Sequence, residues 1–415
     1  MTFGCRLNIY ESQVIKDLTS QAGLNDAIVV NSCAVTAEAE RQVRQSIRKL
    51  RRDNPDAEII VTGCAAQINP DKYRDMPAVD RVIGNQEKLS LASYQDSDEV
   101  LVNDIMSAKE TAGHLITGFD NKARAFIQVQ NGCNHRCTFC TIPYGRGNSR
   151  SVAIGEIVRQ VQQLVDNGYQ EVVITGVDIT DYGLDLPGQP TLGQMIKRLL
   201  AAVPQLQRLR LSSLDPVEMD EDMWRLIGED ARILPHLHIS LQAGDDMVLK
   251  RMKRRHLRHH ILEFCERAKR LRPDVLFGAD IIAGFPTETD KMFENTLNVI
   301  RECPITFAHI FPYSPRPGTP AARMPQVDKA VIKQRAAMLR EAGREQMQRA
   351  LQGQVDREVS VLVEEERDGQ LLGKTDQFLP VSGPLGSSIT MGTVAMAKVC
   401  GHNDDSLQVK WLSKS

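Results

Sequence analysis

The segment Cys133-Asn-His-Arg-Cys137-Thr-Phe-Cys140 decides the fold of this chain. It comes directly after residues 125–130, Ala-Phe-Ile-Gln-Val-Gln, which have the composition of a buried strand. Three thiolates spaced C-x3-C-x2-C can hold three irons of a cubane cluster and leave the fourth iron without a protein ligand. The segment therefore predicts an iron-sulfur loop at the end of a strand, and Phe139 is expected to shield the cluster or pack on its ligand.

A zinc site and a set of buried cysteines are the alternatives for this loop. Zinc needs four ligands, and His135 is separated from Cys133 and Cys137 by too few residues for the loop to wrap one metal easily. The position directly after a strand favours the cluster over both alternatives.

Strand and helix patterns alternate from residue 119 to residue 350. The predicted strands are 125–130, 171–175, 208–212, 236–241, 276–282 and 306–311. The predicted helices are 154–167, 192–203, 219–228, 258–272 and 289–302. Six strand-helix units are too few for a complete (β/α)8 barrel, so we expect a partial (β/α)6 barrel whose functional loops lie at the carboxyl ends of its strands.

The cysteine spacing resembles that of the radical S-adenosylmethionine (SAM) superfamily. In that superfamily the amino and carboxylate groups of SAM occupy the open iron, and an electron from the 4Fe-4S cluster cleaves SAM to a 5′-deoxyadenosyl radical. The resemblance implies that Cys133, Cys137 and Cys140 ligate the SAM cluster.

Small and polar residues end the next four predicted strands, at the edge where SAM is expected. A glycine after a strand is usually only a turn, so each residue alone is weak. Their repetition at successive strand ends makes them candidate SAM contacts: Gly176, Asp178, Ser212, Ser213, Gln242 and Gly284.

Residues 1–110 predict a second α/β unit. Helical patterns at 12–23 and 37–52 alternate with strand patterns at 26–31 and 58–63. This alternation predicts an open parallel sheet.

Three further cysteines belong to this sheet. Cys33 and Cys64 come one or two residues after its predicted strands, and Cys5 would hold the same place after a first strand that is mostly missing. Small buried hydrophobic residues are the alternative. Because ligands bind at the carboxyl edge of such sheets, the shared position favours a site. Met1 stands only four residues before Cys5, so either the start is assigned late or the first strand is truncated, and a truncated strand would expose the second cluster.

The remaining sequence changes character twice. Residues 90–118 are polar and irregular, which predicts a linker. After a charged helical stretch at 327–352, short strand patterns separated by Gly-rich turns predict a small all-β module over 352–415.

Several stretches together resemble one family, the methylthiotransferases. TFGCRLNIYES, VVNSCAVT and VTGCAAQ resemble its amino-terminal cluster domain, and NGCNHRCTFCTIPYGRGNSRS resembles its radical-SAM loop. GFPTETDKMFENT and FPYSPRPGTPAARM continue the match, and GKTDQFLPV resembles the start of a TRAM domain, a small RNA-binding β-barrel. The resemblance covers nearly the whole chain.

The family implies an α/β protein of three domains: a cluster domain with an open parallel sheet at 1–110, a partial (β/α)6 radical-SAM barrel at 119–350 and a TRAM barrel at 352–415. It implies two 4Fe-4S clusters, the second held by Cys5, Cys33 and Cys64, with SAM as the further cofactor. It implies three partners, namely the anticodon loop of tRNA as substrate, a reductant such as flavodoxin or ferredoxin, and a sulfur donor, and no contact with a membrane.

AVTAEAERQVRQSIR and GVDITDYG resemble the branch that acts on N6-threonylcarbamoyladenosine next to the anticodon. They imply methylthiolation at C2 of that base. The alternatives are a methylthiotransferase acting on isopentenyladenosine or on a ribosomal protein aspartate and, more remotely, a non-catalytic iron-sulfur protein that binds RNA.

Candidate RNA contacts are local, because 51 Lys and Arg against 53 Asp and Glu give a nearly neutral chain. Two basic runs offer phosphate contacts, with a solvated charged face as the alternative. They are Arg44, Arg48, Lys49, Arg51 and Arg52, and Arg251, Lys253, Arg254, Arg255 and Arg258. Lys374, Phe378 and Trp411 are candidates for charge and base stacking in the last module.

The sequence also bears on location. No apolar run approaches the roughly 18 residues of a membrane helix, and the start resembles no export signal. Nine thinly spread cysteines suit a reducing compartment, so the cytoplasm is expected.

Overall fold

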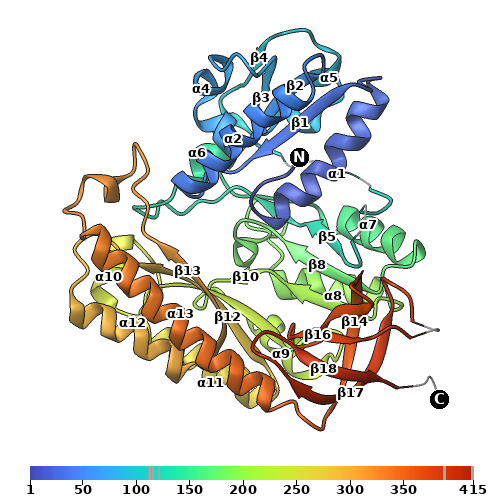
Figure 1. Ribbon diagram of the computed structural model, residues 1–415, viewed down its shortest axis with the longest axis vertical. Helices are drawn as coiled ribbons and strands as arrows, with labels where there is room; N and C mark the ends of the chain where they lie inside the picture. The colour runs from blue at the N-terminus through green and yellow to red at the C-terminus, as the bar shows by residue number, and fades with distance from the viewer. Residues whose placement is uncertain (111–113, 115, 120–121, 387–388, 413–415) are drawn as a thin grey trace.

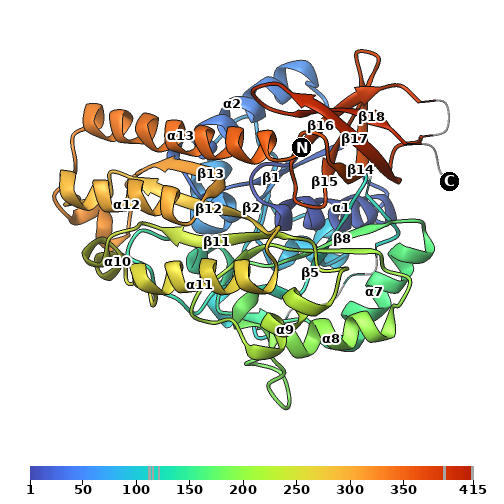
Figure 2. The ribbon, with the colours of Figure 1, turned by 90° about the horizontal axis from the view of Figure 1, so that it is seen from below.

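The computed structural model describes residues 1–110, 114, 116–119, 122–386 and 389–412 (Figures 1 and 2). Its α/β architecture has the three expected parts: an N-terminal parallel sheet, a partial barrel and a closed C-terminal β-barrel. Among these residues, no helix has the length and apolar character needed to cross a membrane.

The N-terminal sheet has the strand order β1-β2-β3-β4, and all its pairings are parallel. Its elements are α1 (Arg6–Gln21), β1 (Ala27–Ser32), α2 (Ala37–Asp53), β2 (Glu58–Gly63), α3 (Cys64–Ile68), α4 (Pro70–Arg74), β3 (Arg81–Ile83), α5 (Ala92–Gln95) and β4 (Val100–Leu101). Buried Val30, Ile59 and Val61 alternate with residues of the opposite face and pack under α2, whose first turn is capped by Thr36.

Two expectations for this region need correction. The predicted linker was placed too early, because α5 buries Tyr94 and β4 completes the sheet. Residues 111–113 and 115 of that predicted linker lie outside the described residues. The helix predicted from residue 12 begins at Arg6, and the expected first strand is reduced to one parallel bridge between Thr2 and Asn31.

The partial barrel consists of two curved parallel sheets, β5-β8-β9 and β10-β11-β12-β13. Its strands are β5 (Ala125–Gln128), β8 (Glu171–Thr175), β9 (Arg208–Leu211), β10 (Ser213–Leu214), β11 (His236–Gln242), β12 (Leu276–Ala283) and β13 (Ile305–Pro312). Its helices are α7 (Ile154–Asp166), α8 (Leu192–Ala202), α9 (Glu221–Glu229), α10 (Asp246–Met252), α11 (Arg258–Leu271) and α12 (Asp290–Glu302). The two sheets meet at Ser212, where the chain passes from β9 to β10 and the Ser212 N–H still bonds to Ile174 in β8 at 3.0 Å.

The barrel is left open between its edge strands, β5 and β13. Helix α1 packs beside β5, with buried Tyr10 and Val14 joining the barrel core. Helix α13 (Lys329–Gln352) packs along β13, and a Cβ on Gly343 would stand 2.7 Å from the Cβ of Ala308. The N-terminal sheet therefore lies over one end of the barrel, at the top of Figure 1.

The last five strands close into a barrel with the order β14-β15-β16-β18-β17. They are β14 (Glu358–Arg367), β15 (Gln370–Thr375), β16 (Pro380–Pro384), β17 (Val394–His402) and β18 (Leu407–Trp411). Phe378 stacks on His236 of β11 with ring centroids 5.1 Å apart, and Trp411 donates to the Pro384 carbonyl at 2.7 Å. Both aromatic side chains have packing partners within the protein, which argues against their use as free platforms for RNA bases.

Candidate functional site: two facing sets of cysteines

The loop with Cys133, Cys137 and Cys140 is closed at its base by an antiparallel pair, β6 (Gln130–Asn131) and β7 (Arg150–Ser151). Gly132 adopts a φ of 74°, and a Cβ there would collide with the Asn148 carbonyl, so only glycine fits easily. The Cys133 N–H then bonds to the Gly147 carbonyl at 3.1 Å. Backbone conformation thus places the first thiol.

Gln130 fixes this loop to the turn after β8. Its side-chain oxygen accepts the N–H groups of Val177 and Asp178, both at 2.9 Å, and its amide nitrogen donates to the Gly132 carbonyl at 2.7 Å. Gly176 belongs to the same turn, and a Cβ on it would stand 2.8 Å from the Gln130 oxygen. Sequence reasoning treated Gln130 only as part of a strand, and nothing in the local pattern marks it as a linker of two loops.

The three thiols have surroundings suited to a cluster. Backbone N–H groups of His135 and Ile142 point at the sulfurs of Cys133 and Cys140, both at 3.4 Å. Burial raises the pKa of Cys140 to about 12 and also raises the pKa of Cys133. Without metal these thiols are protonated, so binding of iron has to release protons, as is usual for thiolate sites.

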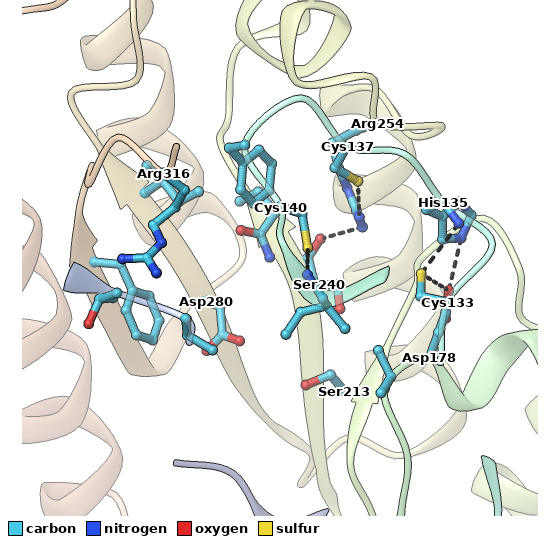
Figure 3. Close-up of a pocket in the computed structure, with 18 of the residues that line it drawn as sticks. Cys133, His135, Cys137, Cys140, Asp178, Ser213, Ser240, Arg254, Asp280 and Arg316 are labelled. Carbon is cyan, nitrogen blue, oxygen red and sulfur yellow. Dashed lines mark hydrogen bonds and ion pairs between the residues drawn. The ribbon is translucent and has the colours of Figure 1, made fainter. Parts of the chain in front are cut away.

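Arg254 stands beside Cys137. Its guanidinium lies 3.7 Å from the Cys137 sulfur and donates to Asp215 at 2.8 Å and to the Ser240 carbonyl at 3.1 Å (Figure 3). Although burial opposes its charge, Asp215 and Cys137 raise its pKa above the usual value. This arginine belongs to a predicted RNA-binding run, but its side chain is committed to the cysteine loop.

His135 provides a test of the zinc alternative. Its Nε2 lies 2.9 Å from Asp178, and the two residues with Cys133 place their ligand atoms within 4.8 Å of one another. This group could hold one metal ion, but it leaves out Cys137 and Cys140, although Cys133 and Cys140 are each within electrostatic reach of Cys137. The three-cysteine site uses all the thiols of the loop.

A cavity of roughly 300 Å³ opens at the carboxyl ends of the barrel strands, next to the three cysteines (Figure 3). Of the expected SAM contacts, Phe139, Asp178, Ser213 and Gln242 line it. Phe139 packs edge-on against Phe285, with ring centroids 6.4 Å apart.

Three expected SAM contacts do not line the cavity: Gly176, Ser212 and Gly284. Gly284 packs instead against α13, where a Cβ would stand 2.5 Å from Ile332. Sequence reasoning also missed lining residues, namely Asp215, Ser240, Asp280 and Arg316. They come from separate elements and share no sequence motif, so only the fold brings them together.

The second set consists of Cys5, Cys33 and Cys64. Both Cys5 and Cys64 are close enough to Cys33 to raise the pKa of its thiol, in addition to the larger effect of burial. Two glycines allow this approach. Gly4 has a φ of 93°, and a Cβ added to it would stand 2.8 Å from the Cys33 sulfur. Gly63, directly before Cys64, has a φ of 94°. Cys33 and Cys64 are buried and Cys5 is exposed.

The two sets of cysteines lie side by side. Helix α6 (Ile142–Arg146) follows Cys140 and packs on α3, so that a Cβ on Gly145 would stand 3.2 Å from the Cβ of Cys64. Val35 and Thr36, just beyond Cys33, line the same cavity as Cys133, Cys137 and Cys140. The second set therefore faces the open end of the barrel.

A fully buried ionic network joins the two sets. Glu11 of α1 binds Arg146 of α6 at 2.8 and 3.0 Å and Lys88 at 2.7 Å. Burial alone would disfavour the carboxylate, but Arg146 and Lys88 hold the pKa of Glu11 at about 2. Lys88 also donates to Asn85 at 2.6 Å, and the Asn85 amide nitrogen lies 3.6 Å from the Cys64 sulfur.

Comparison with known proteins identifies the family. Residues 127–300 match the Radical SAM superfamily, and residues 1–84 match the family described as Uncharacterized protein family UPF0004. The chain is 54% identical over 402 residues to threonylcarbamoyladenosine tRNA methylthiotransferase MtaB of Rickettsia prowazekii, covering 97% of this chain and 94% of that one.

It is 33% identical over 422 residues to tRNA-2-methylthio-N(6)-dimethylallyladenosine synthase of Cereibacter sphaeroides, covering 95% of each chain. The solved radical S-adenosylmethionine methyltransferase TsrM of Kitasatospora setae shares the fold, with a TM-score of 0.54 at 16% identity over 76% of this chain and 68% of that one. The chain is therefore a member of the tRNA methylthiotransferase family of radical SAM transferases.

Proposed function

We propose that this enzyme methylthiolates C2 of N6-threonylcarbamoyladenosine next to the anticodon of tRNA, using two 4Fe-4S clusters. The observation that carries the proposal is that two separate sets of three cysteines lie side by side: the first set lines the cavity, and the second lies next to Val35 and Thr36, which line it too. One set suits the loop of a SAM cluster, and the other lies where sulfur can be delivered to the same base. The 54% identity to an enzyme named for the threonylcarbamoyl substrate favours that substrate over the dimethylallyl one.

The residues have distinct roles in this proposal. Cys133, Cys137 and Cys140 hold the SAM cluster, and Cys5, Cys33 and Cys64 hold the second. When bound, the clusters and SAM would supply three things: the sulfur, the methyl group and the radical that removes hydrogen from C2. No side chain has to act as a base, because an aromatic C–H bond is not broken by proton transfer to a side chain.

The second site fits an anionic cluster. Two cations, Arg146 and Lys88, share the single carboxylate of Glu11, which leaves one positive charge in excess beside Cys64. The charge of Cys64 in turn raises the pKa of Arg146, although burial opposes that shift. Buried charge must be balanced, and thiolates bound to iron at this place would balance it.

Phe139, Asp178, Ser213 and Gln242 are proposed to contact SAM, because they line the cavity beside the first set. Arg48, Lys49 and Arg52 near the end of α2 are exposed and remain candidates for phosphate contacts. A reductant such as flavodoxin or ferredoxin and a sulfur donor complete the reaction. We assign residues 1–110 to the cluster domain, 119–350 to the barrel and 352–415 to the RNA-binding module.

The test uses nucleoside mass spectrometry of tRNA from a deletion strain complemented with each variant. Wild type should restore 2-methylthio-N6-threonylcarbamoyladenosine. Cys137→Ala should abolish both SAM cleavage and modification, while Cys33→Ala should abolish modification and retain SAM cleavage in the purified anaerobic protein. Cys265→Ala, at a buried cysteine outside both sets, is the control. Restoration of only the isopentenyl counterpart would refute the substrate assignment, and modification by Cys33→Ala would refute the second cluster.

A further inference from the structure

Three ionisable side chains meet on one face of the second barrel sheet and include no cysteine of either set. They are His238 of β11, Asp280 of β12 and His309 of β13. Oδ1 of Asp280 lies 3.1 Å from Nε2 of His238 and 3.2 Å from Nδ1 of His309. The three residues place one ligand atom each within 4.8 Å of the others. Two imidazole nitrogens and a carboxylate oxygen thus share one small space.

The register of the strands brings these side chains together. Asp280 is the direct partner of His309, while His238 pairs with Gly278, two residues before Asp280. Because residues two apart on a strand share a face, all three side chains leave the same face of the sheet. A Cβ on Gly278 would stand 2.6 Å from Nδ1 of His238 and 3.2 Å from Nε2 of His236, so the glycine leaves room for both imidazoles.

The group is held from within the protein and is open on one side. His238 is buried, whereas the side chain of His309 is 57% exposed. Asp280 lines the cavity, where Figure 3 shows it across from Cys133. An ion bound here therefore has a path from solvent and faces the cavity from the side away from Cys133.

The charge state and the spacing both suit a metal ion. Burial disfavours the charged form of Asp280, but hydrogen bonds with His238 and His309 lower its pKa, so the carboxylate stays ionised. Metal binding needs an ionised carboxylate and neutral imidazoles. Nitrogen and oxygen ligands about 2.1 Å from one ion lie roughly 3.0 to 3.4 Å from their neighbours. The two distances from Asp280 fall in this range.

We propose that His238, Asp280 and His309 bind one divalent transition-metal ion of the zinc or iron(II) kind, separate from the two clusters. Two imidazoles and one carboxylate are a ligand set that both ions use. Three protein ligands leave a position for water or for an oxygen donor in the cavity. The inference goes beyond the proposed function and does not depend on it, since the ion binds in the absence of tRNA.

The experiment counts zinc and iron per chain by elemental analysis. Full-length protein, loaded anaerobically with iron and sulfide, is dialysed against buffers of graded Zn²⁺ concentration. Wild type should bind one zinc with its iron content unchanged. His309→Ala removes an exposed ligand, and Asp280→Asn keeps the shape of the side chain. Each variant should weaken zinc binding about a hundredfold or more, because loss of a mere outer-shell partner already costs about 10- to 100-fold.

His259→Ala is the matched control, since His259 is an exposed histidine of α11 whose ring centroid lies 3.8 Å from that of His260. It should bind zinc as wild type does. A wild type that binds no zinc would show that the three side chains form a hydrogen-bonded group only. Zinc bound at the wild-type level by either His309→Ala or Asp280→Asn, or lost from His259→Ala, would place the ion elsewhere. Each of these outcomes would overturn the proposal and leave the proposed function intact.

Discussion

Replacement of Glu11 by Gln should loosen the contact between the N-terminal sheet and the barrel. The change keeps the shape of the side chain but removes the one carboxylate that, in the part of the chain that the structure describes, binds Arg146 and Lys88. The pKa of Glu11 falls from 4.5 to about 2 in the folded protein, and each pKa unit corresponds to about 1.4 kcal/mol, so the charge contributes roughly 3 kcal/mol. Removal of one partner of a buried ion pair independently costs about 3 to 5 kcal/mol.

Hydrogen exchange read by mass spectrometry on the anaerobic, cluster-loaded protein measures this loss locally. Peptides from α1 and α6 should lose protection on the order of a hundredfold in the variant, which corresponds to about 3 kcal/mol. Glu38→Gln is the control, because Glu38 pairs with Arg41 on the exposed face of α2, and its protection should stay close to that of wild type. Protection in Glu11→Gln within about threefold of wild type would refute the reasoning.

The pH dependence has a definite sign. Since the folded protein lowers the pKa of Glu11, its contribution to the free energy of unfolding is fully present above pH 4.5 and disappears as the pH falls toward 2. Glu11→Gln should lack this component. A triple variant with Leu at Glu11 and Met at both Lys88 and Arg146 should recover much of the lost protection, because apolar replacement of a whole buried ionic cluster is often close to neutral.

Two further predictions concern glycine and lysine positions. Gly132→Ala should deplete iron from the proposed SAM-cluster loop without replacing a ligand, because the new Cβ collides with the Asn148 carbonyl. Gly155→Ala, on the open surface of α7, is the control and should retain full iron and gain about 1 kcal/mol of stability. Equal iron content in the two variants would refute the argument. Burial lowers the pKa of Lys374 from 10.5 to about 8. Because the unfolded chain binds the proton more tightly, wild type should gain on the order of 2 kcal/mol of stability as the pH rises from 8 to 10.5, and Lys374→Met should not. Parallel pH profiles of the two proteins in denaturant unfolding would contradict this prediction.

The parts of the fold with strong periodicity could be predicted from sequence. The bounds of β2 and β8 match the expected strands, and α2 is one residue longer than expected, since a buried apolar run or an amphipathic pattern determines each of them locally. The short β4 could not be predicted, because two residues carry no periodicity and the strand forms only by pairing with β3. Its place depends on tertiary contacts.

The residues of the candidate site could likewise be predicted only where the signal is local. The cysteines could be found because their spacing and strand-end positions are local features. Arg254 was hidden in a basic run, since nothing in that run distinguishes an arginine that faces a thiol from one that faces solvent. The packing of Gly284 on α13 was also hidden, because a glycine at a strand end suits a ligand and a helix equally well.

The two sets of cysteines share an electrostatic arrangement that bears on RNA binding. Arg254 stands beside Cys137 and is held by Asp215, and Arg146 is held by Glu11 in a network that reaches Cys64. Each arginine is oriented by a carboxylate, so neither can turn away to bind phosphate without leaving a buried charge unpaired. We therefore propose that these cations balance the negative charge of the clusters proposed for the two sets. On this proposal the tRNA backbone binds exposed cations outside the cavity, and the modified base enters the cavity.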